Sequence, residues 1–111
     1  SFSKKPALLL PAHSTPLGMA FHDGRNLQKS MQRGLFISLN GYRSTGHRII
    51  YVPFNSDGMP NKNFFNVISG WDKSNELPKG APVDIRMSDD GALFISDDRN
   101  GNLLRLVYIA P

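Results

Sequence analysis

Short apolar or alternating segments, separated by Gly, Pro, Asn and Asp, recur along the whole chain, and helical periodicity is almost absent. Segments of this kind are typical of β-strands joined by turns. The polar stretch RNLQKSMQRG is interpreted as a loop. The pattern predicts eight strands: Ala7–Leu10, Gly18–His22, Leu35–Leu39, Arg48–Phe54, Phe65–Gly70, Val83–Met87, Leu93–Ser96 and Leu103–Ile109.

One pattern of residues occurs twice. PLGMAFHDG precedes an LFIS strand that begins at Leu35, and PVDIRMSDDG precedes an LFIS strand that begins at Leu93. Each unit runs from a proline through a strand and an Asp-Gly turn to the LFIS strand, and then through a polar loop to a strand that contains arginine. Repeats built from four short strands are typical of β-propeller blades. The sequence therefore predicts an all-β fold, a β-propeller, of which the chain encodes about two four-stranded blades.

The strand count divides the chain into three parts. Residues 18–70 are expected to form blade one, and residues 82–111 blade two, which lacks its outer strand. Residues 1–17 carry a strand that is expected to complete a neighbouring blade. Two blades cannot close a ring, and an open blade face exposes apolar surface and strand edges. We therefore expect the remaining blades either in a longer chain or in identical copies, which would form a homo-oligomer, most simply a trimer with six blades.

Composition and charge narrow the range of partners. The chain has no cysteine, which excludes disulfides and thiolate metal sites. Its net charge is +4, but the thirteen Lys and Arg residues are scattered, so nucleic acid is not an expected partner. A membrane span needs about 20 consecutive apolar residues, and no apolar run here approaches that length. Hydrolase, P-loop, dinucleotide-binding and HExxH motifs are absent.

A resemblance to a known family rests on four stretches: PAHSTPLGMAF, GLFISLNGYRSTGHRIIYVPF, ISGW and GAPVDIRMSDDGALFISDDRNGNLLRLVY. They resemble the C-terminal part of the glucose/sorbosone dehydrogenase family, whose members are six-bladed propellers that oxidise sugars with pyrroloquinoline quinone (PQQ), usually in the periplasm. The resemblance implies a periplasmic or secreted oxidoreductase with a sugar substrate. This chain would supply loops of the quinone pocket and be inactive alone, because the family's catalytic histidine lies in an earlier part.

The same resemblance implies which residues bind the cofactor. They are Asn40, Tyr42 and Arg43, in the loop after the first LFIS strand, and His13 in PAHSTPLG. Arginine binds carboxylates in bidentate fashion, and an aromatic face suits a flat quinone. Ca²⁺ is a second cofactor candidate. The alternative is a surface loop in which Gly41 makes a turn and Arg43 is solvated.

One departure from the family pattern supports a rival function. Relatives commonly place an arginine before the proline of GAPVDIR, and this chain has Ala81. The rival is a non-catalytic β-propeller module that binds a ligand or a protein. His22 and His47 are expected at the surface, and Trp71 is expected to pack between blades. The aspartates of SDDG and SDDRNGN are expected in turns rather than in a calcium site, and Asp84 must face the central channel or be paired.

Overall fold

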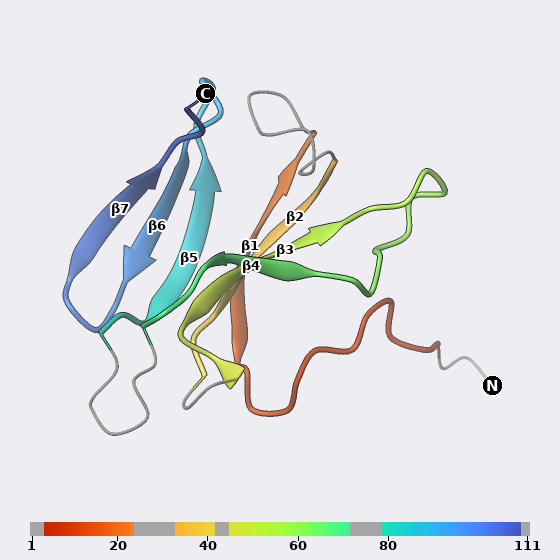
Figure 1. Ribbon diagram of the computed structural model, residues 1–111, viewed down its shortest axis with the longest axis horizontal. Coiled ribbons are helices and arrows are strands. Elements are labelled where there is room, and N and C mark those ends of the chain that lie inside the picture. The colour runs from red at the N-terminus through yellow and green to blue at the C-terminus, as the bar shows by residue number, and fades with distance from the viewer. Residues whose placement is uncertain (1–3, 24–32, 42–44, 72–78, 110–111) are drawn as a thin grey trace.

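Two antiparallel β-sheets make up the protein (Figure 1). The computed structural model describes residues 4–23, 33–41, 45–71 and 79–109. The first sheet has the order β1 (Pro16–His22), β2 (Gly34–Leu39), β3 (Arg48–Pro53) and β4 (Phe65–Ile68); the second has the order β5 (Pro82–Met87), β6 (Leu93–Asp97) and β7 (Asn102–Leu106). The predicted all-β class is therefore confirmed. In these described ranges, no helix has the length and apolar character needed to cross a membrane.

Seven of the eight predicted strands are present, with small differences at their ends. The prediction of a strand at Ala7–Leu10 is wrong, because the described chain before β1 forms no strand. Pro6 and Pro11 flank this segment, and proline cannot donate to a strand ladder. Leu8 and Leu10 instead pack against the first sheet, on the side away from the second sheet. The expected role of this segment in a neighbouring blade stays a prediction.

The two central strands of the first sheet, β2 and β3, are buried on both faces, which explains their nearly continuous apolar sequence. One face contacts the second sheet through a cluster of buried residues: Phe36, Ile49, Tyr51, Ile85, Leu93 and Ile95. Trp71 packs against this cluster, as predicted. We call the other face the outward face of the first sheet. It carries a second buried cluster of Ile37, Leu39, Ile50 and Val52.

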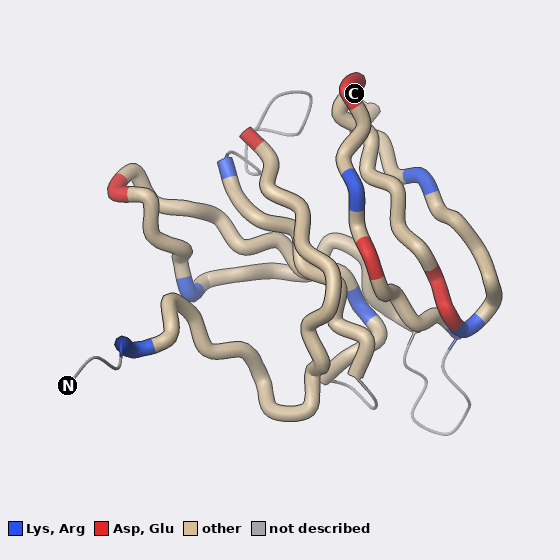
Figure 2. Tube along the Cα trace, turned by 180° about the vertical axis from the view of Figure 1, so that it is seen from behind, with Lys and Arg blue, Asp and Glu red and all other residues tan. Residues whose placement is uncertain are grey.

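Charged residues are distributed unequally between the two sheets. Figure 2 shows the strands of the first sheet almost free of charge, whereas charged residues interrupt the strands of the second. The four strands of the first sheet contain one charged residue, Arg48, at the start of β3. The second sheet carries Asp84, Arg86, Asp97 and Arg105 within its three strands. Because charged side chains are seldom fully buried, the first sheet is better suited than the second to being buried on both faces.

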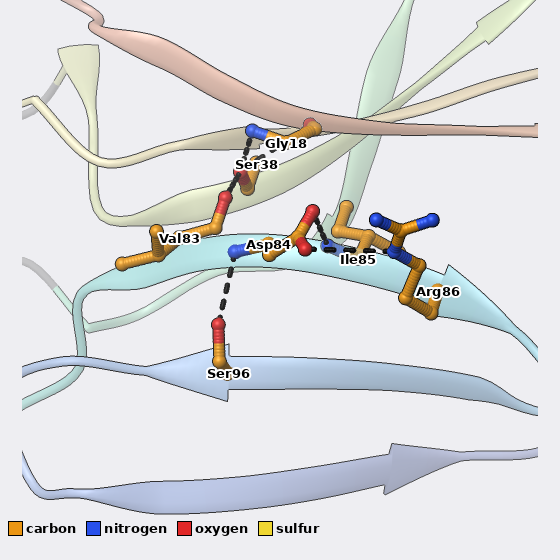
Figure 3. Close-up of polar contacts among 7 residues, drawn as sticks. All are labelled: Gly18, Ser38, Val83, Asp84, Ile85, Arg86 and Ser96. Carbon is orange, nitrogen blue, oxygen red and sulfur yellow. Dashed lines mark hydrogen bonds and ion pairs between the residues drawn. The ribbon is translucent and has the colours of Figure 1, made fainter.

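The two sheets touch closely where β1 passes β5 (Figure 3). A Cβ atom added to Gly18 would lie 2.6 Å from the Asp84 Cα and 2.6 Å from the Val83 carbonyl oxygen. The buried Ser38 hydroxyl accepts a hydrogen bond from the Gly18 N–H at 2.8 Å and donates one to the Val83 carbonyl. Glycine in β1 and serine in β2 therefore set the distance between the sheets.

Candidate functional site

Four connecting segments meet at one end of the two sheets, at the lower edge of Figure 1, where β1 and β5 begin. They precede β1 and β5 and join β2 to β3 and β6 to β7. We call the described residues 13–15, 40–41, 45–47, 79–81 and 97–100 the loop cluster. It contains the described part of the predicted cofactor site.

Main-chain hydrogen bonds tie the segment before β1 to the segment after β2. The Asn40 N–H donates to the Thr15 carbonyl at 2.9 Å, and the Gly41 N–H donates to the Ser14 carbonyl at 2.8 Å. A Cβ atom on Gly41 would lie 2.0 Å from the His13 carbonyl oxygen, so only glycine allows this approach. Glycine is therefore required at position 41 by the close packing of the segment after β2 against the segment before β1. The sequence predicts only that Gly41 makes a turn.

The backbone of the loop cluster is strained. Three non-glycine residues in the described chain have positive φ angles: His13 at 63°, Thr15 at 50° and His47 at 55°. All three belong to the loop cluster. A positive φ is uncommon for any residue with a Cβ and is an outlier for β-branched threonine. Strained residues of this kind persist where the surrounding structure holds them, and they concentrate at binding and catalytic sites.

A buried hydroxyl lies in the same segment. The Ser14 side chain is 1% exposed, and its Oγ has no hydrogen-bond partner among the described residues. Leaving a buried polar group unsatisfied costs about 1–3 kcal/mol. Native structures contain few such groups, and each one calls for an explanation such as a bound water or a ligand.

Side chains of the first sheet's loops hold the main chain that leads into β5. The Asn40 Nδ2 donates to the Pro82 carbonyl at 3.1 Å, and the His47 Nδ1 lies 3.0 Å from the Gly80 carbonyl. Because a carbonyl oxygen only accepts, this contact assigns the proton to Nδ1 of His47. The Gly80 backbone lies against the Trp71 ring, since an added Cβ would meet it at 2.7 Å. The loop cluster is therefore shared between the two sheets.

Asp97, at the end of β6, organises the second sheet's part of the loop cluster. Its side chain is buried, and its Oδ1 accepts hydrogen bonds from the N–H groups of Ala81 at 2.9 Å and Arg99 at 3.0 Å. The Asn100 Nδ2 donates to Oδ2 at 2.8 Å and to the Lys79 carbonyl at 2.6 Å. Burial alone would raise the pKa of Asp97, but the hydrogen bonds to its carboxylate outweigh burial and lower this pKa.

The predicted cofactor-binding residues have different positions in the structure. His13 is exposed within the loop cluster, and Asn40 is half-buried and bonded to Pro82. Tyr42 and Arg43 lie outside the described residues. The structure thus brings His13 and Asn40 to one end of the sheets, and their contact with a cofactor stays a prediction. Ser14 and Asp97 were not predicted as site residues.

The prediction that His22 and His47 are surface residues is wrong, because both side chains are buried. His22 is the last residue of β1, where period-two alternation places it on the same face as Gly18 and Ala20, at the end opposite to the loop cluster. That alternation was visible in the sequence. His47 precedes β3 and has a positive φ, so strand alternation does not place it, and its ring is buried where it contacts the Gly80 carbonyl of the segment before β5.

The acidic turns behave as predicted in the SDDG segment. Asp90 accepts hydrogen bonds from the Ser88 hydroxyl and from the Ala92 N–H at 3.1 Å. These two bonds, Ser88 first, lower the pKa of Asp90. Within the part of the chain that the structure describes, no three His, Asp or Glu side chains are grouped so that they could hold a metal ion.

Comparison with known proteins identifies the family. A family model described as TrAA12-like matches residues 1–108. The chain belongs to the TrAA12-like family. An uncharacterized protein of Borreliella burgdorferi is 33% identical over 103 residues, which cover 89% of this chain and 27% of that protein. The chain therefore spans much less than half of that relative. No solved structure matches this TrAA12-like chain.

The assignment to the glucose/sorbosone dehydrogenase family is therefore wrong, because the matching family model is TrAA12-like. The labels oxidoreductase, quinoprotein and PQQ came with that assignment and are withdrawn with it. The stretches that carried the resemblance have structural roles in this fold: LFIS forms central strands, and the aspartate of SDDG holds a turn. Residues that specify a fold do not specify its chemistry. The periplasmic or secreted location stays a prediction.

Proposed function

We propose that this TrAA12-like chain forms two neighbouring blades of a β-propeller, and that its loop cluster is part of a binding face for a small, hydroxyl-rich ligand such as a sugar. One observation carries the proposal. The strained residues His13, Thr15 and His47 and the unpartnered hydroxyl of Ser14 all lie in the loop cluster.

The repeated geometry of the two sheets supports the blade arrangement. The Gly18 N–H donates to the Ser38 Oγ at 2.8 Å in the first sheet, and the Asp84 N–H donates to the Ser96 Oγ at 3.0 Å in the second. Each sheet also has a register shift at the same place, between Pro16 and Met19 in the first and between Pro82 and Ile85 in the second. In a β-propeller, equivalent four-stranded sheets are repeated around a central axis and pack face to face.

The polar groups of the loop cluster suit a neutral ligand with many hydroxyls. Ser14 and Thr45 contribute hydroxyls, His13 an imidazole and Asn100 an amide, and such groups both donate and accept hydrogen bonds. Sugar hydroxyls have the same dual capacity. Loops held by a rigid scaffold are the usual place for binding residues, and this cluster is held by hydrogen bonds from both sheets.

The proposal can be tested by titrating isotope-labelled protein with D-glucose and a panel of other monosaccharides while recording amide NMR shifts. We expect saturable shifts at Ser14, Gly41 and Thr45, and none at Gly91 on the opposite end of the sheets. Ser14→Ala removes a hydroxyl that has no protein partner among the described residues, so it should weaken binding about five- to tenfold, the equivalent of one hydrogen bond, without loss of stability.

Two controls keep this test specific. Ser88→Ala removes a hydroxyl at the opposite end and should leave the sugar affinity unchanged. His13→Asn removes the imidazole but keeps a residue that tolerates positive φ, so it separates loss of a contact from loss of backbone conformation. Absence of saturable shifts for every sugar, or shifts spread evenly over both ends, would contradict the proposed function.

A further inference from the structure

A pocket of about 150 Å³ lies at the end of the sheets opposite to the loop cluster, at the upper edge of Figure 1, where β1 and β5 end. His22 and Asp23 line it at the end of β1, and Ser88, Asp89 and Gly91 line it in the turn between β5 and β6. We call it the β1–β5 pocket. Its walls come from both sheets, and none of its lining residues belongs to the loop cluster.

The charge of the β1–β5 pocket is opposite to that of the whole chain, which has a net charge of +4. Asp23 and Asp89 line the pocket, whereas no lysine or arginine does so among the described residues. The Asp23 side chain is 54% exposed, and the Asp89 side chain has no hydrogen-bond or ion-pair partner in the described ranges. The Arg33 guanidinium lies over the Phe21 ring and does not line the pocket. Two carboxylates in a concave site concentrate a negative potential, which attracts cations.

A buried imidazole belongs to the same wall. The His22 side chain is 4% exposed, and its Nδ1 lies 3.8 Å from the Asp23 Oδ1. One nitrogen of a neutral imidazole accepts hydrogen bonds. Ser88 adds a hydroxyl whose proton is donated within its own turn, to Asp90 or to the Ala92 carbonyl. Toward a ligand, the Ser88 hydroxyl therefore acts as an acceptor.

The interior behind His22 also carries a polar group. The Tyr51 hydroxyl is buried and has no hydrogen-bond partner among the described residues. It is directed to this end of the first sheet, because a Cβ atom added to Gly34 would lie 2.5 Å from it, and Gly34 is paired with His22. Buried polar groups at the end of an apolar interface call for an explanation, such as water or a polar ligand in the adjoining pocket.

The lining of the β1–β5 pocket favours an organic ammonium over a metal ion. Metal ligands lie at about 2.0–2.6 Å from the ion, and the described chain groups no three His, Asp or Glu side chains that could hold a metal. A primary ammonium has three N–H donors, and its hydrogen bonds span about 2.7–3.2 Å, so its acceptors can lie farther apart. Asp23, Asp89 and His22 supply such acceptors. Met87, which also lines the pocket, supplies an apolar contact for a carbon chain.

We infer that the β1–β5 pocket binds a small primary alkylammonium ion, whose nitrogen donates hydrogen bonds to Asp23, Asp89 and His22. The pocket volume suits a ligand of a few non-hydrogen atoms. The inference goes beyond the proposed function and does not rest on it, because the two sites lie at opposite ends of the sheets. They also differ in ligand charge, since the loop cluster offers neutral groups that donate and accept, and the β1–β5 pocket offers acceptors and carboxylates.

The test is a titration of isotope-labelled protein with n-propylammonium chloride at constant ionic strength and about pH 8, where a histidine with the ordinary pKa of about 6.5 is neutral. We expect saturable amide NMR shifts at Asp23, Asp89 and Gly91, and none at Ser14 in the loop cluster. Asp23→Asn and Asp89→Asn should each weaken the affinity about tenfold or more, because each removes a hydrogen bond to a charged group. Asp98→Asn, which removes an exposed aspartate of the loop cluster, is the charge-matched control and should leave the affinity unchanged.

Two further ligands separate the N–H donors from the charge and from the carbon chain. Tetramethylammonium has the same charge but no N–H donor, and n-propanol has the same carbon chain but no charge. Both should bind at least about tenfold more weakly than n-propylammonium. Asp23 and Asp89 are exposed, so both variants should fold, and either variant alone is sufficient for the test.

Three results would each overturn the inference: no saturable shifts with n-propylammonium, equal affinity for tetramethylammonium, or an effect of Asp98→Asn as large as that of Asp23→Asn. Sugars are expected to leave Gly91 unshifted and to act at the other end of the sheets. Failure of the ammonium titration and failure of the sugar titration are therefore distinguishable.

Discussion

Replacing Gly18 with alanine should separate the two sheets at the point where β1 passes β5. The added Cβ would lie 2.6 Å from the Asp84 Cα and the Val83 carbonyl oxygen, whereas ordinary contact begins at 3.4 Å. Both neighbours are backbone atoms and cannot rotate away, so the strands must move apart by about 0.8 Å. Overpacking of this kind costs about 1–3 kcal/mol. Weakening the hydrogen bond between Ser38 and Val83 adds about 1 kcal/mol, so we expect a loss of about 2–4 kcal/mol.

Urea unfolding followed by tryptophan fluorescence measures this loss directly, because the single tryptophan, Trp71, packs against the cluster between the sheets. Asp84→Ala is the matched control. It changes the equivalent position of the second sheet, which is exposed, and should alter the free energy of unfolding by less than about 0.5 kcal/mol. If Gly18→Ala cost no more than this control, β1 and β5 would not be in contact at Gly18, and the account of the interface would be refuted.

Three further predictions concern buried polar groups. Ser38→Ala should cost about 1–3 kcal/mol in urea unfolding, because it leaves the Gly18 N–H and the Val83 carbonyl unsatisfied; a loss below 0.5 kcal/mol, the scale of a surface change, would contradict this. Tyr51→Phe should leave stability unchanged or raise it by about 1 kcal/mol, because the Tyr51 hydroxyl is buried without a partner in the described chain. Burial raises the pKa of Tyr51 to about 12, so an ultraviolet titration should show the folded protein's Tyr51 ionising well above the ordinary tyrosine pKa of about 10. Because ionisation is harder in the folded state, the free energy of unfolding should hold its Tyr51 contribution below pH 10 and lose it as the pH rises towards 12. Hydrogen bonds lower the pKa of Asp97 in the folded state despite its burial. The ionised carboxylate should therefore stabilise the fold above the unfolded-state pKa of about 4, and this contribution to the free energy of unfolding should be lost as the pH falls through the lower folded-state pKa. A difference in unfolding free energy between wild type and Asp97→Asn that did not narrow below pH 4 would be inconsistent with this.

The strands could be predicted from the sequence because each depends on local alternation and on turn residues. The two LFIS segments and the SDDG turn formed as expected. The segment Ala7–Leu10 was predicted as a strand from its apolar residues alone. It has no strand partner in the described chain; Leu8 and Leu10 pack on the outward face of the first sheet instead, and Leu9 is exposed. Apolar character alone did not distinguish a segment that joins a sheet from one that packs against it.

The candidate site could be predicted only in part. The sequence indicated His13 and Asn40, and both lie in the loop cluster. Asn40 contributes there by holding the Pro82 carbonyl, which is a contact between residues far apart in the sequence. Ser14 and Asp97 were missed for the same reason, because their burial depends on how loops of the two sheets meet. The Asp97–Asn100 spacing, in which an aspartate accepts hydrogen bonds from the following turn, was the signal available for Asp97.

A crystal structure of the longest natural polypeptide that contains this sequence would show whether the two sheets are neighbouring blades. Blade packing predicts a further β-sheet on the outward face of the first sheet, over Met19 and Ile37, with glycine and serine at the positions of Gly18 and Ser38. It also predicts that the loops of that sheet lie at the same end as the loop cluster. An outward face covered by a helix, or by a sheet whose corresponding loops lie at the opposite end, would contradict the blade arrangement.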